Sequence, residues 1–236
     1  MLKSKKEISL IENACLLADK TFDYILTKVS FGISEKELSL EIQRFIRKNG
    51  AKLSFRPILS FGKNSAEVHH KPNGTKLKKG DIIMLDLGAK LEDYCSDITR
   101  TIFFGKATPE QKKLYQTVLD AQTKAIEFLI SHFSSPISST ERLKASKVDK
   151  IARDHIIKQG YPSIPHGLGH GIGKKVHQAP RLSPESKSIL KTNMVFSVEP
   201  GIYIKDFGGI RIEDLVVLEE KNVRILSRAN REIIEL

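Results

Sequence analysis

The stretch IPHGLGHGIGKKVHQAP, residues 164–180, contains three of the seven histidines of the chain. Glycine alternates with other residues through GLGHGIG, so that four glycines fall within seven positions. Each would cost a helix about 1 kcal/mol relative to alanine, which argues against a helix here. An extended segment is expected instead, with His166, Leu168, His170 and Ile172 on one face.

The spacing of these histidines limits how many of them can bind one metal ion. Four residues of strand span about 13 Å, whereas a Zn–N bond measures only about 2.0–2.1 Å. We therefore expect at most one metal ligand in this stretch, with the other histidines contacting substrate. The glycines would let another backbone or a substrate approach closely. Taken alone, a glycine-rich surface loop with incidental histidines is an equally good interpretation.

The composition is that of an ordinary globular protein. The chain has 236 residues, of which 40% are hydrophobic and 28% are charged. No apolar run approaches the 18 or so residues of a transmembrane helix, and the N-terminus MLKSKKEISLIENA lacks the apolar core of a signal peptide. Only two cysteines occur, Cys15 and Cys95, which favours a reduced, cytoplasmic chain with both thiols as packing residues.

The net charge of +11 raises the question of nucleic-acid binding. The lysines are scattered instead of forming one stripe, and aromatic residues are not interleaved with them. This pattern is typical of a solvated surface, so nucleic acid is not the expected partner.

The first half of the chain predicts a long helix, a shorter helix and then strands. Capping boxes open both helices, at Ser4–Glu7 and at Ser34–Glu37, and the second helix should end near Gly50. Apolar residues recur every three or four positions along the first helix. Three strand-like stretches follow: LSFRPILSFG, DIIMLDLGA and DITRTIFFG.

The second half repeats this order. A further cap at Thr108–Gln111, with Pro109 at the first helical position, starts a helix that should run to about His132. A Ser/Pro-rich link at 134–139 and a helix near 147–159 come next, followed again by strands. The repeated order predicts a duplicated α+β architecture within one compact domain.

Carboxylates within apolar strands are the informative anomaly, because buried charge is costly unless it is paired or bound to metal. Four such residues occur: Asp86 in IIMLDLGA, Asp97 before ITRTIFF, Glu199 at the end of MVFSVE, and Glu213 in GIRIED. Capping or salt bridges could explain any one of them. Four together favour a shared site.

Neighbouring residues are candidates to hold these carboxylates in place. Asp86 and Asp97 would lie near the loop end of a hairpin, where the hydroxyl of Thr99 could orient Asp97. Arg211 stands two residues before Glu213, on the same side of the expected strand, and could fix an acidic ligand and offset part of the charge.

The donor set also indicates which ions the site would take. Carboxylates with one imidazole suit Mn²⁺ better than a thiolate zinc site would. Four carboxylates exceed what one catalytic zinc usually takes, whereas two adjacent ions could share bridging oxygens. The residues therefore predict a two-metal hydrolase.

Taken together, the motifs resemble those of the pita-bread metallopeptidase superfamily, most closely its Xaa-Pro aminopeptidase and prolidase branch. The resemblance covers nearly the whole chain, residues 1–236, which it identifies as a single catalytic domain. It implies two pseudo-symmetric helix-helix-strand halves around a curved antiparallel sheet. The motifs that carry it are KSKKEI, GKNSAEVHHKP, KKGDIIMLDLGAKLEDYCSDITRT, HGLGHGIGKKVHQAP, SVEPGIYI and GGIRIEDLVVL.

The resemblance implies two divalent metal ions, with Mn²⁺ preferred over Co²⁺ or Zn²⁺. Asp97 and Glu213 match the bridging positions of the family. The full implied set of metal ligands is Asp86, Asp97, His170, Glu199 and Glu213.

The resemblance also implies roles in binding and hydrolysing a peptide. His69 matches the substrate histidine of the family, and His166 and His177 match two further histidines of the cleft. Glu199 is the candidate general base, while His69 and His177 would stabilise the carbonyl oxygen or the developing tetrahedral centre. The expected reaction is hydrolysis of the N-terminal Xaa-Pro bond of peptides or dipeptides.

Two departures from the family pattern stand out. Members of this branch usually carry an additional N-terminal domain, and this chain begins where the catalytic domain begins, so proline specificity and a homodimer both stay open. Gln178 stands where an acidic residue commonly follows the histidine.

Two alternatives have the same expected fold. Methionine aminopeptidase shares all five ligands, but its motif resembles HGIGRxFHExP and lacks the second GH pair. A non-catalytic pita-bread binding module would generally have lost ligands, and all five are present here.

Overall fold

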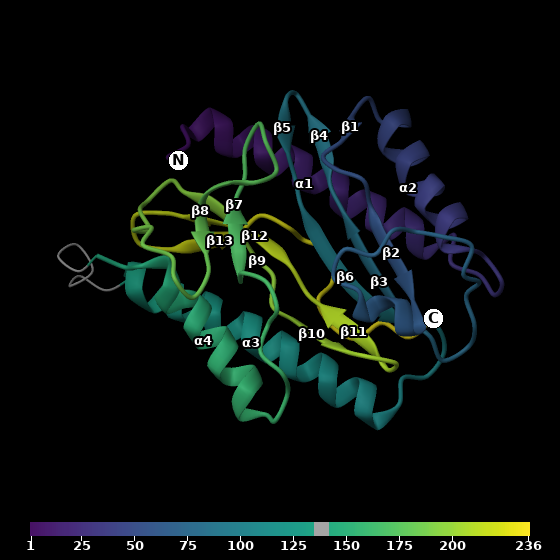
Figure 1. Ribbon diagram of the computed structural model, residues 1–236. Coiled ribbons are helices and arrows are strands. Elements are labelled where there is room, and N and C mark those ends of the chain that lie inside the picture. Colours follow the sequence, from purple (N-terminus) through teal and green to yellow (C-terminus); the bar gives the residue numbers. More distant parts are fainter. Residues whose placement is uncertain (135–141) are drawn as a thin grey trace.

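The computed structural model describes residues 1–134 and 142–236 (Figure 1). Each half contains a long helix, a shorter helix and several strands, which confirms the predicted α+β order. The helices are α1 (Lys5–Leu26), α2 (Glu35–Lys48), α3 (Pro109–Ser134) and α4 (Ala145–Lys158), with a short 3-10 helix η1 (Gly62–Ala66). The strands are β1 (Lys52–Leu53), β2 (Ile58–Phe61), β3 (Ile82–Leu87), β4 (Ala89–Leu91), β5 (Tyr94–Cys95), β6 (Ile98–Phe103), β7 (Gly169–Gly171), β8 (Gln178–Leu182), β9 (Val195–Val198), β10 (Gly201–Ile204), β11 (Gly208–Arg211), β12 (Asp214–Leu218) and β13 (Val223–Ile225).

The predicted capping boxes form at the start of α1 and α2. In each, a serine hydroxyl accepts the backbone N–H of a glutamate three residues later, whose carboxylate accepts the serine N–H. Thr108 and Gln111 make the same reciprocal pair before α3, at 2.8 and 3.2 Å. These bonds satisfy N–H groups that a helix start leaves free, so three of the four helices begin where the local sequence predicts.

The start of the fourth helix was predicted less accurately from the sequence. α4 starts at Ala145 instead of near residue 147, and Lys144 at its N-cap makes no side-chain capping bond. The Ser/Pro-rich link predicted at 134–139 lies outside the described residues, apart from Ser134 at the end of α3.

The strands of the named sheets pair antiparallel. The first half contributes the sheet β2-β3-β6, and the second contributes β13-β12-β9-β7-β8. The two halves meet where Thr99 of β6 forms an antiparallel bridge with Glu213, whose N–H donates to the Thr99 carbonyl at 3.1 Å. Two smaller sheets, β1-β4-β5 and β10-β11, flank this junction.

The helices bury apolar side chains against strands of both halves; Ile8 of α1, for example, shares a cluster with Val195 of β9 and Val217 of β12. One cluster joins Phe22 of α1 and Leu38 of α2 to Ile83 of β3. Another joins Val118 of α3 to Phe196 of β9. In Figure 1, α3 and α4 lie below the strands, while α1 and α2 lie on the opposite side. Within residues 1–134 and 142–236, no helix is both long and apolar enough to span a bilayer.

A buried ion pair connects the two halves beneath their junction. Arg100 of β6 and Asp214 of β12 are 1% and 0% exposed, and their charged groups lie 2.6 Å apart. Arg100 also donates to the backbone carbonyls of Thr99 and Glu213, at 3.0 and 2.6 Å. Gln122 of α3 donates to the second carboxylate oxygen of Asp214, at 3.0 Å. The guanidinium therefore fixes the backbone of both residues that form the bridge.

We expect Arg100→Ala to lower the free energy of unfolding by about 3–5 kcal/mol, because the buried Asp214 carboxylate then keeps only the more distant Arg231, at 3.9 Å, as a cationic partner. The matched control is Arg44→Ala, which removes an arginine whose side chain is 72% exposed and pairs with Glu41 at the surface. That loss should stay below about 1 kcal/mol. Urea denaturation of both variants checks this, and equal losses would contradict the role assigned to Arg100.

Candidate metal centre and active-site cavity

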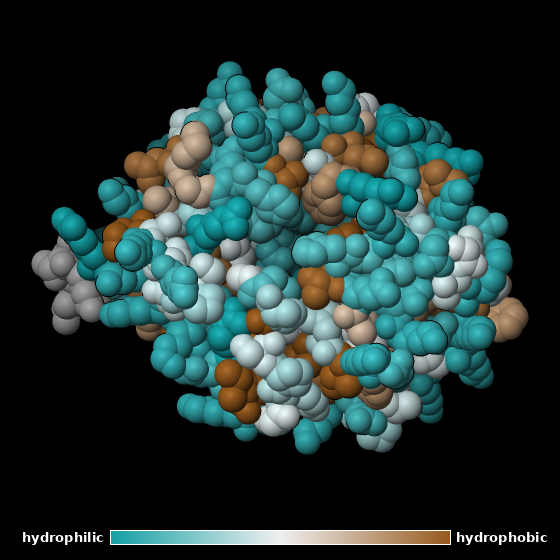
Figure 2. Space-filling model, viewed as in Figure 1, coloured by the Kyte–Doolittle hydropathy of each residue, from teal (hydrophilic) through white to brown (hydrophobic). Residues whose placement is uncertain are grey.

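A cavity of about 380 Å³ lies between the two halves. Figure 2 shows a hollow near the middle of this face, surrounded largely by hydrophilic residues. The cavity lining includes every residue predicted to bind metal or substrate: Asp86, Asp97, His170, Glu199, Glu213, His69, His166 and His177. Strands far apart in the sequence thus bring all of these side chains to one place.

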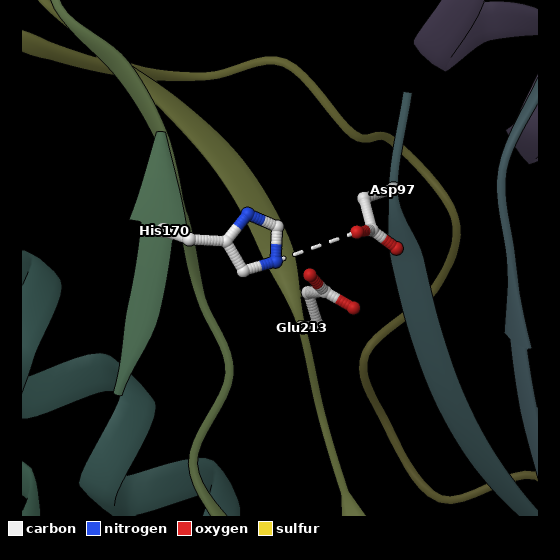
Figure 3. Close-up of side chains that lie close together, drawn as sticks. All are labelled: Asp97, His170 and Glu213. Carbon is white, nitrogen blue, oxygen red and sulfur yellow. Dashed lines mark ion pairs between the residues drawn. The ribbon is translucent and has the colours of Figure 1, made fainter. Parts of the chain in front are cut away.

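Three of the predicted metal ligands form a tight cluster. One ligand atom from each of Asp97, His170 and Glu213 lies within 4.8 Å of the other two. Asp97 directly precedes β6, His170 is the central residue of β7, and Glu213 lies between β11 and β12. Figure 3 shows the three side chains converging from these separate elements. Such a group of oxygens and one imidazole can hold a divalent ion.

The other two predicted ligands line the same cavity but lie outside that cluster. Oε1 of Glu199 is 3.3 Å from Nε2 of His170 and accepts the hydroxyl proton of Ser197 at 2.9 Å. Asp86 is turned toward Arg211, whose guanidinium lies 2.7 Å from its Oδ2. The arginine thus holds one oxygen of Asp86 and leaves the other free.

The carboxylates are poorly satisfied by the rest of the protein. Within the described chain, Asp86 Oδ1, Asp97 Oδ1 and Glu213 Oε1 are buried without a hydrogen-bond partner. Burial and repulsion from neighbouring carboxylates raise the pKa of Asp97 and of Glu213 well above their usual values. Burial also raises the pKa of Glu199, to about 7. A divalent cation would supply the missing partner and the missing positive charge, so these residues fit a metal site.

His170 has the protonation state that metal binding requires. Burial, reinforced by the nearby His177, lowers the pKa of His170 to about 4. The imidazole is therefore neutral near pH 7 and has a nitrogen free to bind a metal. The rings of His170 and His177 pack edge to face, with centroids 4.3 Å apart.

Thr99 has a different partner from the one predicted. Its hydroxyl donates to Oε2 of Glu213 at 2.8 Å, and not to Asp97. The backbone bridge between Thr99 and Glu213 brings these two side chains together. Asp97 precedes the strand that contains Thr99, so the alternation of a strand does not carry over to it.

Arg211 fixes an acidic residue as predicted, but the residue is Asp86. β11 ends at Arg211, so the strand expected to contain both Arg211 and Glu213 is interrupted, although both side chains contact the hydroxyl of Thr99. Arg211 also donates to the hydroxyl of Tyr203 at 2.8 Å, and Tyr203 lies 2.8 Å from Nε2 of His166. Because Tyr203 accepts from the arginine, its own proton is available to the imidazole. This chain connects the Asp86 carboxylate to the cavity histidine.

Tyr203 and Ser197 are site residues that the sequence analysis missed. Ser197 accepts the backbone N–H of His170 at 3.0 Å and donates to Glu199. Both residues are separated from Glu199 by an even number of positions. That spacing gave no sound signal, because Glu199 and Pro200 lie between β9 and β10 and interrupt the alternation.

The histidine stretch is not one continuous strand. His166 and His170 line the cavity, but the pairing of β7 with β8 shifts in register between His170 and Gly171. Leu168 and Ile172 instead pack into two separate apolar clusters. The prediction that all four apolar and imidazole side chains share one face is therefore wrong, because the irregular pairing redirects the chain.

The glycines allow close approach of neighbouring strands. A side chain at Gly169 would collide with the carbonyl of Ser197 in β9, and one at Gly171 with the carbonyl of Ala179 in β8. These contacts hold His170 between two strands. The glycines were predicted to allow close approach of either another backbone or a substrate, and the contacts at Gly169 and Gly171 are with neighbouring backbone.

A second buried carboxylate holds the segment that contains His166. Asp149 of α4 is 0% exposed and forms a two-point ion pair with Arg153, at 2.9 Å on both sides. Asp149 accepts the N–H of Leu168, while Arg153 donates to the carbonyls of Ile164 and His166. Burial lowers the pKa of His166 to about 4, so this imidazole is neutral near pH 7.

Comparison with known proteins defines the class to which this site belongs. Residues 9–220 match metallopeptidase family M24, and the chain belongs to this family.

The individual relatives narrow the comparison further. An Xaa-Pro dipeptidase of Pyrococcus horikoshii is 38% identical over 236 residues, covering 99% of this chain and 64% of that protein. The structure of an Xaa-Pro dipeptidase from Bacillus anthracis has a TM-score of 0.91 at 36% identity, covering 100% of this chain and 64% of that one. The structure of an X-Pro aminopeptidase from Thermotoga maritima has a TM-score of 0.92 at 35% identity, and the match covers 100% of this chain and 65% of that one.

These matches confirm the pita-bread fold expected from the sequence motifs. The chain spans less than two thirds of the length of these relatives.

We expect His170→Ala to weaken binding of Mn²⁺ at least about tenfold, because it removes the only neutral nitrogen of the Asp97–His170–Glu213 cluster. The matched control is His177→Ala, which removes the neighbouring imidazole and should leave the affinity close to that of the unaltered protein. Isothermal titration calorimetry and elemental analysis after dialysis measure both. Equal metal loss in the two variants would contradict the different roles of these histidines.

Glu199 should contribute to the stability of the metal-free protein in a way that is lost as the pH rises, opposite in sign to the contributions of His166 and His170, whose pKa values are lowered to about 4. The pKa of Glu199 is raised from 4.5 to about 7, so the folded chain binds more protons than the unfolded chain between these values. The contribution of Glu199 to the free energy of unfolding is then fully present below about pH 4.5 and is lost as the pH rises to about 7.

The melting temperature in excess chelator measures this loss, at about 2–4 °C for each kcal/mol. Mn²⁺ should restore the melting temperature at pH 7.5. A pH profile in chelator equal to that of Glu199→Gln, with metal removal verified, would contradict this contribution of Glu199.

Proposed function

We propose that this chain is a metal-dependent exopeptidase that hydrolyses the bond between an N-terminal residue and a following proline. The observation that carries the proposal is the convergence of four carboxylates and four histidines on one cavity, on a fold shared with Xaa-Pro peptidases. We further propose that residues 1–236 act as one catalytic domain.

The proposed metal ligands are Asp86, Asp97, His170, Glu199 and Glu213. Asp97 and Glu213 would bridge two ions, and the unpartnered buried oxygens of both support this assignment. The oxygen-rich donor set favours Mn²⁺ over Co²⁺ or Zn²⁺. When bound, the ions would polarise the scissile carbonyl and make water a nucleophile near neutral pH.

Glu199 is proposed as the general base. Its place in the cavity, with Oε1 3.3 Å from Nε2 of His170, and the burial that raises its pKa to about 7 in the absence of metal support this role. The hydrogen bond from Ser197 to Oε1 holds the carboxylate in the cavity and leaves Oε2 as the proton acceptor.

The histidines are proposed to bind the peptide. His69 and His177 are exposed at the cavity and would donate hydrogen bonds to the carbonyl oxygen and to the tetrahedral centre as it forms. His166, held by Tyr203, would shape the pocket for the residue after the cleaved bond.

A proline substrate suits the rest of the cavity. The bond before proline is a tertiary amide without an N–H, so the enzyme must hold the substrate by the ring, by the amino end and by the carbonyl. Ile58, Val68 and Leu182 line the cavity and offer apolar contacts to the ring. Arg181 also lines it and forms no ion pair within the described residues, so it could bind the carboxylate of a short peptide.

The remaining expectations concern compartment and partners. Cys15 and Cys95 are both free and buried, which supports the proposed cytoplasmic location. A peptide is the proposed partner, and the scattered lysines give no support for nucleic acid. A homodimer is compatible with the resemblance of the chain to its family.

We expect faster turnover of Ala-Pro-Ala than of Met-Ala-Ala at saturating Mn²⁺, because the cavity can hold the proline ring and needs no amide N–H. Release of the N-terminal residue, followed by liquid chromatography, gives both rates. The dipeptide Ala-Pro belongs in the same series, and Asp97→Asn serves as the inactive control. Faster cleavage of the methionyl peptide would favour a methionine aminopeptidase, and no cleavage of any of these peptides would favour a binding module.

A further inference from the structure

His69 lines the cavity without a hydrogen bond of its own. Its side chain is exposed, and its imidazole makes no such bond within the described part of the chain. It lies within a turn that is closed by a bond from the His70 N–H to the Glu67 carbonyl, at 3.1 Å. The position of the His69 imidazole therefore depends on whatever holds this turn.

A buried carboxylate is the centre of that support. Glu35, the first residue of α2, is 0% exposed and accepts four hydrogen bonds of 2.8–3.0 Å. The donors are the backbone N–H groups of Phe61 and Asn73, the amide of Asn64 and the ring of His70. Together they fix both ends and the middle of the segment 61–73, which contains the His69 turn.

His70 links this centre to the turn itself. Its Nε2 lies 2.8 Å from Glu35 and its Nδ1 lies 2.7 Å from Glu67. Each ring nitrogen therefore faces a carboxylate oxygen, an arrangement that favours the doubly protonated ring. Burial by itself lowers the pKa of His70, but its hydrogen bonds to Glu67 and Glu35 raise that pKa above its usual value.

We propose that His70 and Glu35 are positioning residues, which hold the 67–70 turn so that the His69 imidazole faces the cavity. The inference rests on the proposed function, in which His69 contacts substrate. His70 itself is 5% exposed and is absent from the cavity lining, so it acts only through its neighbour. Loss of this support would misplace His69 without removing a metal ligand.

The kinetic test compares His70→Gln in two backgrounds. On its own, His70→Gln should lower kcat/KM for Ala-Pro-Ala by about 10- to 100-fold, because small misplacements of a catalytic group have large effects on rate. In a His69→Ala background it should cause no further loss, since the group that it positions is already gone. An equal fold-loss in both backgrounds would overturn the proposal by showing that His70 acts elsewhere.

A second measurement does not depend on activity. Hydrogen–deuterium exchange of the metal-loaded protein should speed up in His70→Gln across residues 62–76, and metal content should stay unchanged. The matched control is Arg153→Gln, which breaks the corresponding support in the second half and should affect 163–168 instead. Unchanged exchange over 62–76 in His70→Gln would overturn the proposal.

The two tests also separate failure of this inference from failure of the proposed function. If the unaltered protein cleaves no peptide, the proposed function fails and hydrogen exchange still decides whether His70 holds the turn. Glu35→Gln provides a further variant that keeps the shape of the side chain and removes its charge. It should speed exchange over the same residues, and protection equal to that of the unaltered protein would count against the proposal.

Discussion

The organisation of this protein follows from one electrostatic constraint, the accumulation of buried negative charge where its two halves meet. Asp86, Asp97, Glu199 and Glu213 all line one cavity, and Arg211 is the only cation that forms an ion pair with any of them among arginine and lysine side chains of the described residues. An arrangement with so little compensation is unfavourable in the absence of a bound cation. It persists because the surrounding structure holds the carboxylates in place: helices pack on the outer side of each half, and Arg211, Thr99 and Ser197 donate side-chain hydrogen bonds to Asp86, Glu213 and Glu199.

Each half holds a segment with a cavity histidine in place, but the two halves use different residue types to do so. In each, the shorter helix supplies a fully buried carboxylate, Glu35 in α2 and Asp149 in α4, which holds a segment with a cavity histidine. The first half uses a histidine as the cationic partner, whereas the second uses Arg153. The two halves therefore place groups of the same role at corresponding positions but use different residue types. A search for repeated sequence would not find this correspondence.

The sequence predicts local features well and long-range ones poorly. Capping residues such as Ser4 and Ser34 act within four positions, so the helix starts could be derived directly. The carboxylates stood out because charge within an apolar strand needs a reason. The partner of Thr99 could not be derived, since it depends on a bridge to a residue 114 positions away. The sequence predicted that Arg211 fixes an acidic residue, but not that this residue is Asp86, because the interruption after β11 is not visible in the pattern GIRIED.

The division of the proposed ligands between the halves ties metal binding to the last stage of folding. Asp86 lies in the first sheet and Asp97 directly precedes its strand β6, whereas the remaining three ligands belong to the second half. The Thr99–Glu213 bridge and the Arg100–Asp214 ion pair are among the contacts that join the two halves. Bringing Thr99 and Glu213 together closes a loop of 114 residues, which is entropically costly and slow. Neither half can therefore form a complete site before the two halves have packed together. An ion that requires all five ligands therefore stabilises only the fully assembled chain, and its binding free energy becomes part of the free energy of folding. In physiological terms, the supply of metal would then set the lifetime of the folded protein as well as its activity.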